Sequence, residues 1–152
     1  MRKKQKLLWL CGILILLNLA LIWGNSLATG EQSGEISGSV VETVMEVLDI
    51  PPQKEDLLHK LIRKMAHFTE FMCLGMLLSW QRKLRGAVTP VSYPLLLGMA
   101  AALVDETIQM FIPDRGPSLT DVWIDTSGTL TGMLLLLTGY YLVSKFKKQN
   151  QS

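Results

Sequence analysis

Long runs of apolar residues alternate with short polar segments along this chain. Three of the runs occupy residues 7–23, 91–112 and 119–143. A helix rises about 1.5 Å per residue, so about 20 apolar residues cross the hydrocarbon core of a bilayer. A fourth run, residues 61–80, is less apolar because ionisable residues interrupt it. The pattern predicts an all-α membrane protein with four transmembrane helices, forming a single domain over residues 1–152.

The segments that flank the runs differ in charge. Basic residues precede the first run and follow the second and the fourth, whereas residues 24–60 are rich in acidic side chains. Because Lys and Arg favour the cytoplasmic side, both termini are predicted to be cytoplasmic. Residues 24–60 and the turn at 113–118 are then extracytoplasmic. Apolar residues at helical spacing from Val40 to Leu48 predict a short amphipathic helix at the outer surface, with a lid over a substrate as the alternative.

The first run also has features of a secretory signal peptide. A basic stretch precedes it, and Ser26-Leu27-Ala28 fits a small-x-small cleavage site. Its apolar core is longer than the usual length of about 7–15 residues. A retained transmembrane helix is therefore the favoured interpretation, and cleavage near residue 28 is the alternative.

The overall composition agrees with a membrane protein. Hydrophobic residues make up 49% of the 152 residues and charged residues only 18%, less charge than soluble domains usually have. The formal net charge is +2 and the basic residues form no long block, so no nucleic-acid partner is expected. Cys11 and Cys73 lie inside apolar runs, where neither a disulfide nor a metal-ligand motif is indicated.

Ionisable residues in the second run lie on one face of the predicted helix. Arg63, His67 and Glu70 are spaced i, i+4, i+7, which aligns their side chains. A charged side chain at the centre of a membrane helix costs about 2.5–3.5 kcal/mol on insertion scales, so it normally faces protein or water and has a partner. These residues are therefore candidates for a functional site.

Further polar residues, which could pair with those on this face, lie in the runs 91–112 and 119–143 and in the turn between them. They are Asp105, Glu106, Gln109, Arg115, Asp121 and Asp125. The helical rise places them in the outer half of the bilayer, so three helices are predicted to form one outward-facing polar pocket. Further along the last run, Gly128 and Gly132 form a small-xxx-small face that is predicted to pack closely against a neighbouring helix.

Three sequence blocks resemble the VanZ-like family of bacterial membrane proteins. They are Arg63-Lys-x-Ala-His-Phe-x-Glu70, Asp105-Glu106-x-x-Gln109-x-Phe-x-Pro113-x-Arg115, and Asp121-Val122-x-x-Asp125-x-x-Gly128-x-x-x-Gly132. The resemblance extends over about residues 23–139. It implies a small multi-pass protein of the bacterial plasma membrane, in a family whose founding member is associated with resistance to the glycopeptide teicoplanin. It implies no particular reaction, so these residues are identified as motif positions only.

Three functions fit such a pocket. In the first, Arg63 and Arg115 hold an anionic envelope component such as a lipid phosphate, a peptidoglycan-precursor carboxylate or a teichoic-acid unit. In the second, an enzyme modifies a lipid-linked envelope molecule, with His67 and Glu70 as a candidate acid/base pair or with carboxylates and His67 as a mixed metal site. In the third, a homo-oligomer transports a lipid or solute with protons.

Binding is the preferred function because the chain has no signature of an enzyme class. It contains no phosphate loop, no GxGxxG and no HExxH sequence. Whether the protein is an enzyme is left open, and neither a cofactor nor a metal is assigned.

A structural role is the alternative to all three functions. Arg63 and Arg115 would then neutralise Asp105, Glu106 or Asp121 and fasten the helices. Polar contacts between membrane helices average only about 0.6 kcal/mol, so packing would fasten them at a lower insertion cost. The gathering of many ionisable groups at one level therefore favours a function.

Overall fold

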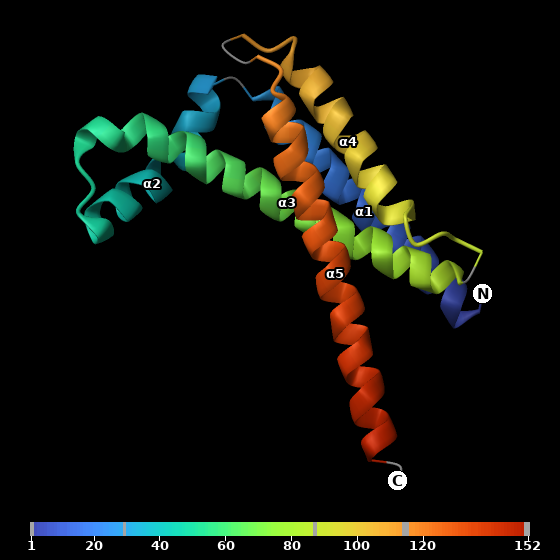
Figure 1. Cartoon of the computed structure of the whole chain (residues 1–152). Coiled ribbons are helices and arrows are strands. Elements are labelled where there is room, and N and C mark those ends of the chain that lie inside the picture. Colours follow the sequence, from blue (N-terminus) through green and yellow to red (C-terminus); the bar gives the residue numbers. More distant parts are fainter. Residues whose placement is uncertain (1, 29, 87, 114–115, 151–152) are drawn as a thin grey trace.

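The computed structural model of the chain is all helical (Figure 1) and describes residues 2–28, 30–86, 88–113 and 116–150. Its helices are α1 (Lys3–Leu27), α2 (Gly30–Leu48), α3 (Glu55–Arg85), α4 (Tyr93–Gln109) and α5 (Leu119–Gln149), with a 3-10 turn at Pro52–Lys54. These ranges contain no β-strand. The predicted all-α fold class is confirmed.

Three predicted transmembrane runs lie within α1, α3 and α5, whereas the predicted run 91–112 extends beyond both ends of α4. α1, α3 and α5 are longer than their apolar runs because the polar flanks continue the helix. α3 has the largest excess, with 31 residues where a span over 61–80 was expected. α4 has only 17 residues, since Pro90 precedes it and a turn from Met110 ends it. Apolar runs therefore located the helices but not their ends.

The segment between the first two apolar runs contains a longer helix than predicted. α2 has 19 residues, whereas apolar periodicity was evident only from Val40 to Leu48. After α2, Asp49 adopts a φ of 49°, and the Ile50 N–H donates to the Met45 carbonyl at 3.0 Å. This is the Schellman arrangement that ends a helix.

Among the described helices, α1 is long and apolar enough to cross a membrane by length and hydropathy. Ile15 and Ile22 of α1 are buried against Phe71 and Leu74 of α3 and Ala102 of α4. The core of the molecule therefore lies where α1, α3 and α4 meet.

α5 crosses α3 at closely packed glycines (Figure 1). A side chain at Gly132 would collide with the Met72 carbonyl, and a Cβ at Gly128 would lie 2.5 Å from the Phe68 carbonyl. The two backbones touch because these glycines have no side chains. The predicted close packing at Gly128 and Gly132 is confirmed.

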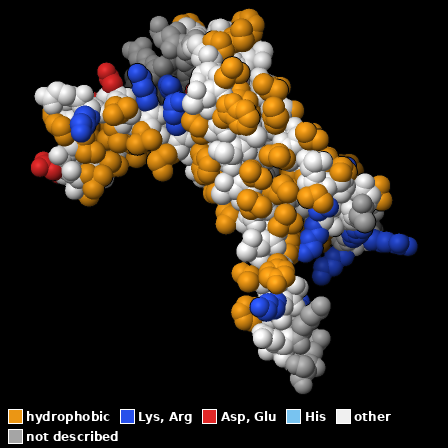
Figure 2. Space-filling view, in the orientation of Figure 1, with side chains coloured by type: hydrophobic (Ala, Val, Ile, Leu, Met, Phe, Trp, Pro, Cys, Tyr) orange, Lys and Arg blue, Asp and Glu red, His pale blue; other side chains and the backbone are white. Residues whose placement is uncertain are grey.

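Basic residues gather near the N-terminal end of α1. Figure 2 shows Lys and Arg side chains there, with others over the first part of α3 and on α5, and hydrophobic side chains over much of the remaining visible face. Near this end the Cys11 thiol donates to the Leu77 carbonyl at 3.3 Å, and the Lys83 ammonium lies 2.9 Å from the centre of the Tyr140 ring. The beginning of α1 and the end of α3 therefore lie at this end, and α5 passes the end of α3 at Tyr140 before its last turns extend away from the other helices (Figure 1).

Candidate functional site

Polar side chains from four helices meet at the opposite end. We define the polar cluster as Asn25 and Ser26 of α1, Arg63, Lys64, His67 and Glu70 of α3, Asp105, Glu106 and Gln109 of α4, and Asp121 and Asp125 of α5. It includes every predicted site residue except Arg115, which lies outside the described residues.

Asp105 connects three helices within this cluster. Its side chain is fully buried, and its Oδ1 accepts a hydrogen bond of 2.5 Å from the Ser26 hydroxyl. Its Oδ2 accepts one of 2.8 Å from Nε2 of Gln109, the i, i+4 pairing that the sequence spacing allowed. The same Oδ2 lies 3.8 Å from Nδ1 of His67. Asp105 therefore holds α1, α3 and α4 together around one carboxylate.

His67 faces two carboxylates without a hydrogen bond to either. Its Nδ1 lies 4.0 Å from Oε2 of Glu70 and 3.8 Å from Oδ2 of Asp105, beyond the usual limit of about 3.2 Å. Among the described residues, neither this Nδ1 nor Oε2 of Glu70 has a hydrogen-bond partner. The other oxygen of Glu70 accepts from Nδ2 of Asn25 at 2.5 Å. His67 and Glu70 are thus neighbours, as predicted, but are not directly bonded.

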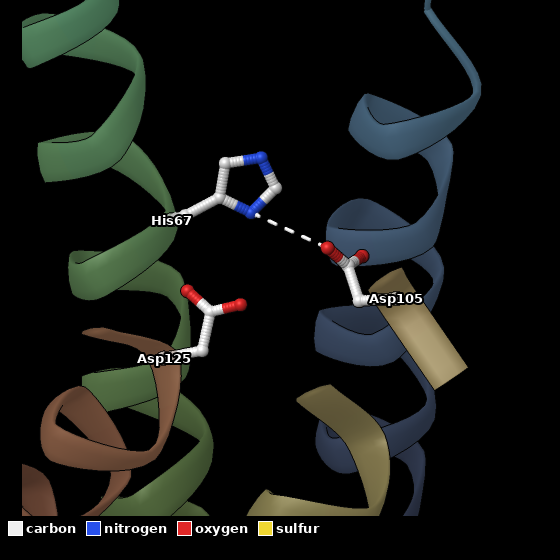
Figure 3. Close-up of side chains that lie close together, drawn as sticks. All are labelled: His67, Asp105 and Asp125. Carbon is white, nitrogen blue, oxygen red and sulfur yellow. Dashed lines mark ion pairs between the residues drawn. The ribbon is translucent and has the colours of Figure 1, made fainter. Parts of the chain in front are cut away.

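Asp125 completes a group of three with His67 and Asp105. Figure 3 shows the carboxylates of both aspartates and the His67 ring around a common space. One donor atom from each of these residues lies within 4.8 Å of the other two. Asp125 is only 2% exposed, and no described residue donates a hydrogen bond to its carboxylate. A buried carboxylate without such a donor is costly.

An ion pair and a hydrogen bond lie at the other side of the cluster. Nζ of Lys64 and Oδ1 of Asp121 form an ion pair at 2.5 Å, and Oε2 of Glu106 accepts from the Ser118 backbone N–H at 2.6 Å. The structural alternative placed Arg63 and Arg115 against Asp105, Glu106 or Asp121. Among the described residues, the ion-pair partner of Asp121 is Lys64, and no carboxylate forms an ion pair with Arg63.

The cluster surrounds a small cavity. Its volume is about 20 Å³, and it is lined by Arg63, Lys64, His67, Gln109, Asp121, Ile124 and Asp125. One water molecule requires about 10–15 Å³ on this measure. The cavity therefore has room for one water molecule or one ion, but not for a whole lipid head group.

Three members of the cluster were not among the predicted site residues. Lys64 belongs to the first sequence block, but it lies off the stripe that Arg63 and His67 define. Asn25 and Ser26 are small polar residues at the end of an apolar run. Their signals were this position and the resemblance of Asn25-Ser26 to a Ser-containing segment of the VanZ-like family, because their partners Glu70 and Asp105 lie 45 and 79 residues away.

Comparison with known proteins identifies one match. A protein-family model described as VanZ/LLP1 matches residues 8–142. No curated protein and no solved structure matches the chain. The matched range includes every residue of the polar cluster.

Proposed function

Because the chain belongs to the VanZ/LLP1 family, we propose that it is a multi-pass protein of the bacterial plasma membrane that binds an anionic group at its polar cluster. The anion belongs to an envelope lipid or a wall precursor, and its binding contributes to tolerance of glycopeptides such as teicoplanin. The observation that carries this proposal is the half-buried guanidinium of Arg63, which has no ion-pair or hydrogen-bond partner among the described residues.

Exposed apolar side chains support four membrane crossings. Leu16 and Leu17 of α1, Leu96 of α4, and Leu134 and Leu135 of α5 are all exposed. Monomeric soluble proteins rarely expose extended apolar surfaces of this kind. α3 is less apolar, but it packs against α1, α4 and α5, so polar residues such as His67 and Glu70, which are 12% and 20% exposed, face protein.

The charge distribution supports an outward-facing cluster. Basic residues lie at the start of α1, at the end of α3 and near the end of α5, away from the cluster. Short cytoplasmic segments are enriched in Lys and Arg. The polar cluster then faces the outside, where wall precursors and teichoic acids are assembled.

Arg63 provides a cation that no described carboxylate neutralises. It lines the cavity, yet it makes no hydrogen bond or ion pair with a described residue, although several carboxylates are near. A guanidinium presents a rigid fork of donors that suits phosphate and carboxylate oxygens. Because the cavity holds only one water molecule or ion, the anion contacts its rim, and the rest of the head group lies outside.

Retention of anionic lipid by Arg63 variants tests the proposal. Detergent-purified wild-type chain is mixed with phosphatidylglycerol or phosphatidylcholine, and lipid retention is measured by native mass spectrometry. Arg63→Gln should lower retention of phosphatidylglycerol severalfold and leave that of phosphatidylcholine unchanged. Lys60→Gln is the matched control, because Lys60 is an exposed cation on the same helix and does not line the cavity.

The same variants are then compared in cells. At matched membrane levels, Arg63→Gln should remove teicoplanin protection and Lys60→Gln should keep it. Equal lipid retention and equal protection in both variants would reject anion binding at Arg63.

One observation favours catalysis as a second candidate function. Nδ1 of His67 and Oε2 of Glu70 face each other at 4.0 Å, and neither has a hydrogen-bond partner among the described residues. Acid/base pairs are often this loose without substrate. Catalysis predicts that envelope lipids differ in composition between cells with the wild-type chain and cells with Glu70→Gln. Binding alone predicts the same composition in both.

A further inference from the structure

We propose that His67, Asp105 and Asp125 bind one divalent transition-metal ion. The three residues come from α3, α4 and α5, and their nearest donor atoms all lie within 4.8 Å of one another. Figure 3 shows these side chains directed into one space. An imidazole nitrogen and two carboxylate oxygens form a donor set suited to Zn²⁺ or Mn²⁺.

The separations between the donors fit ligands of a shared ion. Imidazole nitrogens and carboxylate oxygens bind Zn²⁺ at about 2.0–2.2 Å, so two ligands of one ion lie at most about 4.4 Å apart. Nδ1 of His67 and Oδ2 of Asp105 are 3.8 Å apart, too far for a hydrogen bond but within this limit. A contraction of about 0.4 Å would bring the widest pair into range, and small side-chain rotations supply it.

Missing hydrogen bonds at two of the three residues, His67 and Asp125, are an independent indication of a ligand. Asp125 is 2% exposed and receives no hydrogen bond from a described residue. Nδ1 of His67 has no hydrogen-bond partner in the part of the chain that the structure describes. Buried polar atoms normally have partners. A metal ion would satisfy both groups at once.

The charge balance also calls for a cation. The described part of the polar cluster has five carboxylates, on Glu70, Asp105, Glu106, Asp121 and Asp125, but its only Lys or Arg residues are Arg63 and Lys64. Like charges at this separation repel strongly in a buried site. A divalent ion beside Asp105 and Asp125 would offset this repulsion.

Neighbouring residues already hold one of the ligands in place. The Ser26 hydroxyl and the Gln109 amide both donate to the Asp105 carboxylate. Hydrogen bonds of this kind orient metal ligands and raise affinity. Three protein ligands leave an open coordination position, and the adjoining cavity has room for one water molecule or one oxygen atom of an anion.

This metal site goes beyond the proposed anion binding and does not depend on it. Arg63 lines the same cavity but is not a metal ligand, because a guanidinium has no lone pair to donate. Arg63→Gln should therefore bind metal as the wild-type chain does. A wild-type chain that binds Co²⁺ but retains phosphatidylglycerol no better than phosphatidylcholine would contradict anion binding alone. A wild-type chain that retains phosphatidylglycerol but binds no Co²⁺ would contradict the metal site alone.

Metal binding to the full chain tests the inference directly. Detergent-purified protein is stripped with a chelator, dialysed and titrated with Co²⁺, whose visible spectrum reports its ligands. Wild-type chain should bind one Co²⁺ per chain, and Zn²⁺ should displace it. Asp125→Asn should weaken binding at least tenfold, whereas Asp56→Asn, which changes an exposed carboxylate at the start of α3, should not.

Two results would overturn the proposal. One is a wild-type chain that gives no saturable Co²⁺ spectrum at one ion per chain. The other is an Asp125→Asn chain that binds Co²⁺ as tightly as wild type. Circular dichroism and gel filtration establish that the variants are folded, and the wild-type titration decides the matter even if Asp125→Asn does not fold.

Discussion

Gly132 of α5 lies directly against the backbone carbonyl of Met72 in α3, with no space for a side chain between them. One turn earlier on α5, Gly128 lies against Phe68, which follows His67 in the chain. Asp125 precedes Gly128 by three residues in α5, and His67 directly precedes Phe68 in α3. Both are proposed metal ligands. The glycine contact therefore sets the distance between α3 and α5 at the polar cluster.

Gly132→Ala should destabilise the protein and loosen the cluster. A Cβ at position 132 would overlap the Met72 carbonyl, and overpacking of this kind typically costs about 1–3 kcal/mol. Thermal unfolding in detergent, monitored by circular dichroism, measures the loss. Gly139→Ala is the matched control, since a Cβ there has no neighbour within 4 Å, and it should be neutral or slightly stabilising. Equal behaviour of the two variants would contradict the close packing.

Ser26→Ala should destabilise the protein although it removes a single oxygen atom. The Ser26 hydroxyl donates to the fully buried Asp105 carboxylate at 2.5 Å, and removal of a donor to a buried charge costs about 1–3 kcal/mol. Ser127→Ala is the control, because that exposed hydroxyl donates only to the Ile124 carbonyl of its own helix. Unfolding midpoints that fall equally in both variants would show that α1 is not held through Ser26.

The sequence predicted those parts of the fold that local spacing determines. Apolar runs located α1, α3, α4 and α5, and the i, i+4 spacing anticipated the Gln109–Asp105 hydrogen bond. Gly128 and Gly132 were correctly assigned to helix packing. In each case the deciding residues lie within a few positions of one another.

The remaining features depend on contacts between distant residues. Ser26 meets Asp105 across 79 positions, and nothing near Ser26 in the chain specifies that carboxylate. Lys64, and not its neighbour Arg63, forms the ion pair with Asp121. Which of the two residues faces Asp121 depends on the rotation of α3 about its own axis, and packing against α5 sets that rotation. The 31-residue length of α3 escaped prediction because its polar ends lack the apolar pattern on which the bounds were based.

The Lys64–Asp121 ion pair should contribute little to stability despite its short distance. The two side chains are 38% and 28% exposed, and ion pairs of this exposure typically contribute about 0–1 kcal/mol because water and salt screen them. A double-mutant cycle with Lys64→Met and Asp121→Asn should therefore give a coupling energy below about 1 kcal/mol. Unfolding experiments on the wild type, the two single variants and the double variant supply the four free energies of the cycle, at low and at high salt. A coupling well above this range would mean that the pair is shielded from water.

Cysteine labelling tests the proposed orientation at two exposed loop positions. Gly116 lies in the turn between α4 and α5, beside the polar cluster, and Val88, which is 95% exposed, lies between α3 and α4 at the basic end. The positive-inside pattern places Gly116 outside and Val88 in the cytoplasm. An impermeant maleimide should label Gly116→Cys in intact cells and Val88→Cys only after the cells are permeabilised.

The unsubstituted chain measures background labelling in this experiment, because it already contains the buried Cys11 and the partly buried Cys73. Labelling of Val88→Cys but not of Gly116→Cys in intact cells would place the polar cluster on the cytoplasmic side. Wall precursors assembled outside could then not reach Arg63, and a ligand of the inner leaflet would have to replace them. The labelling pattern thus decides which envelope molecules can be ligands, independently of any measured affinity.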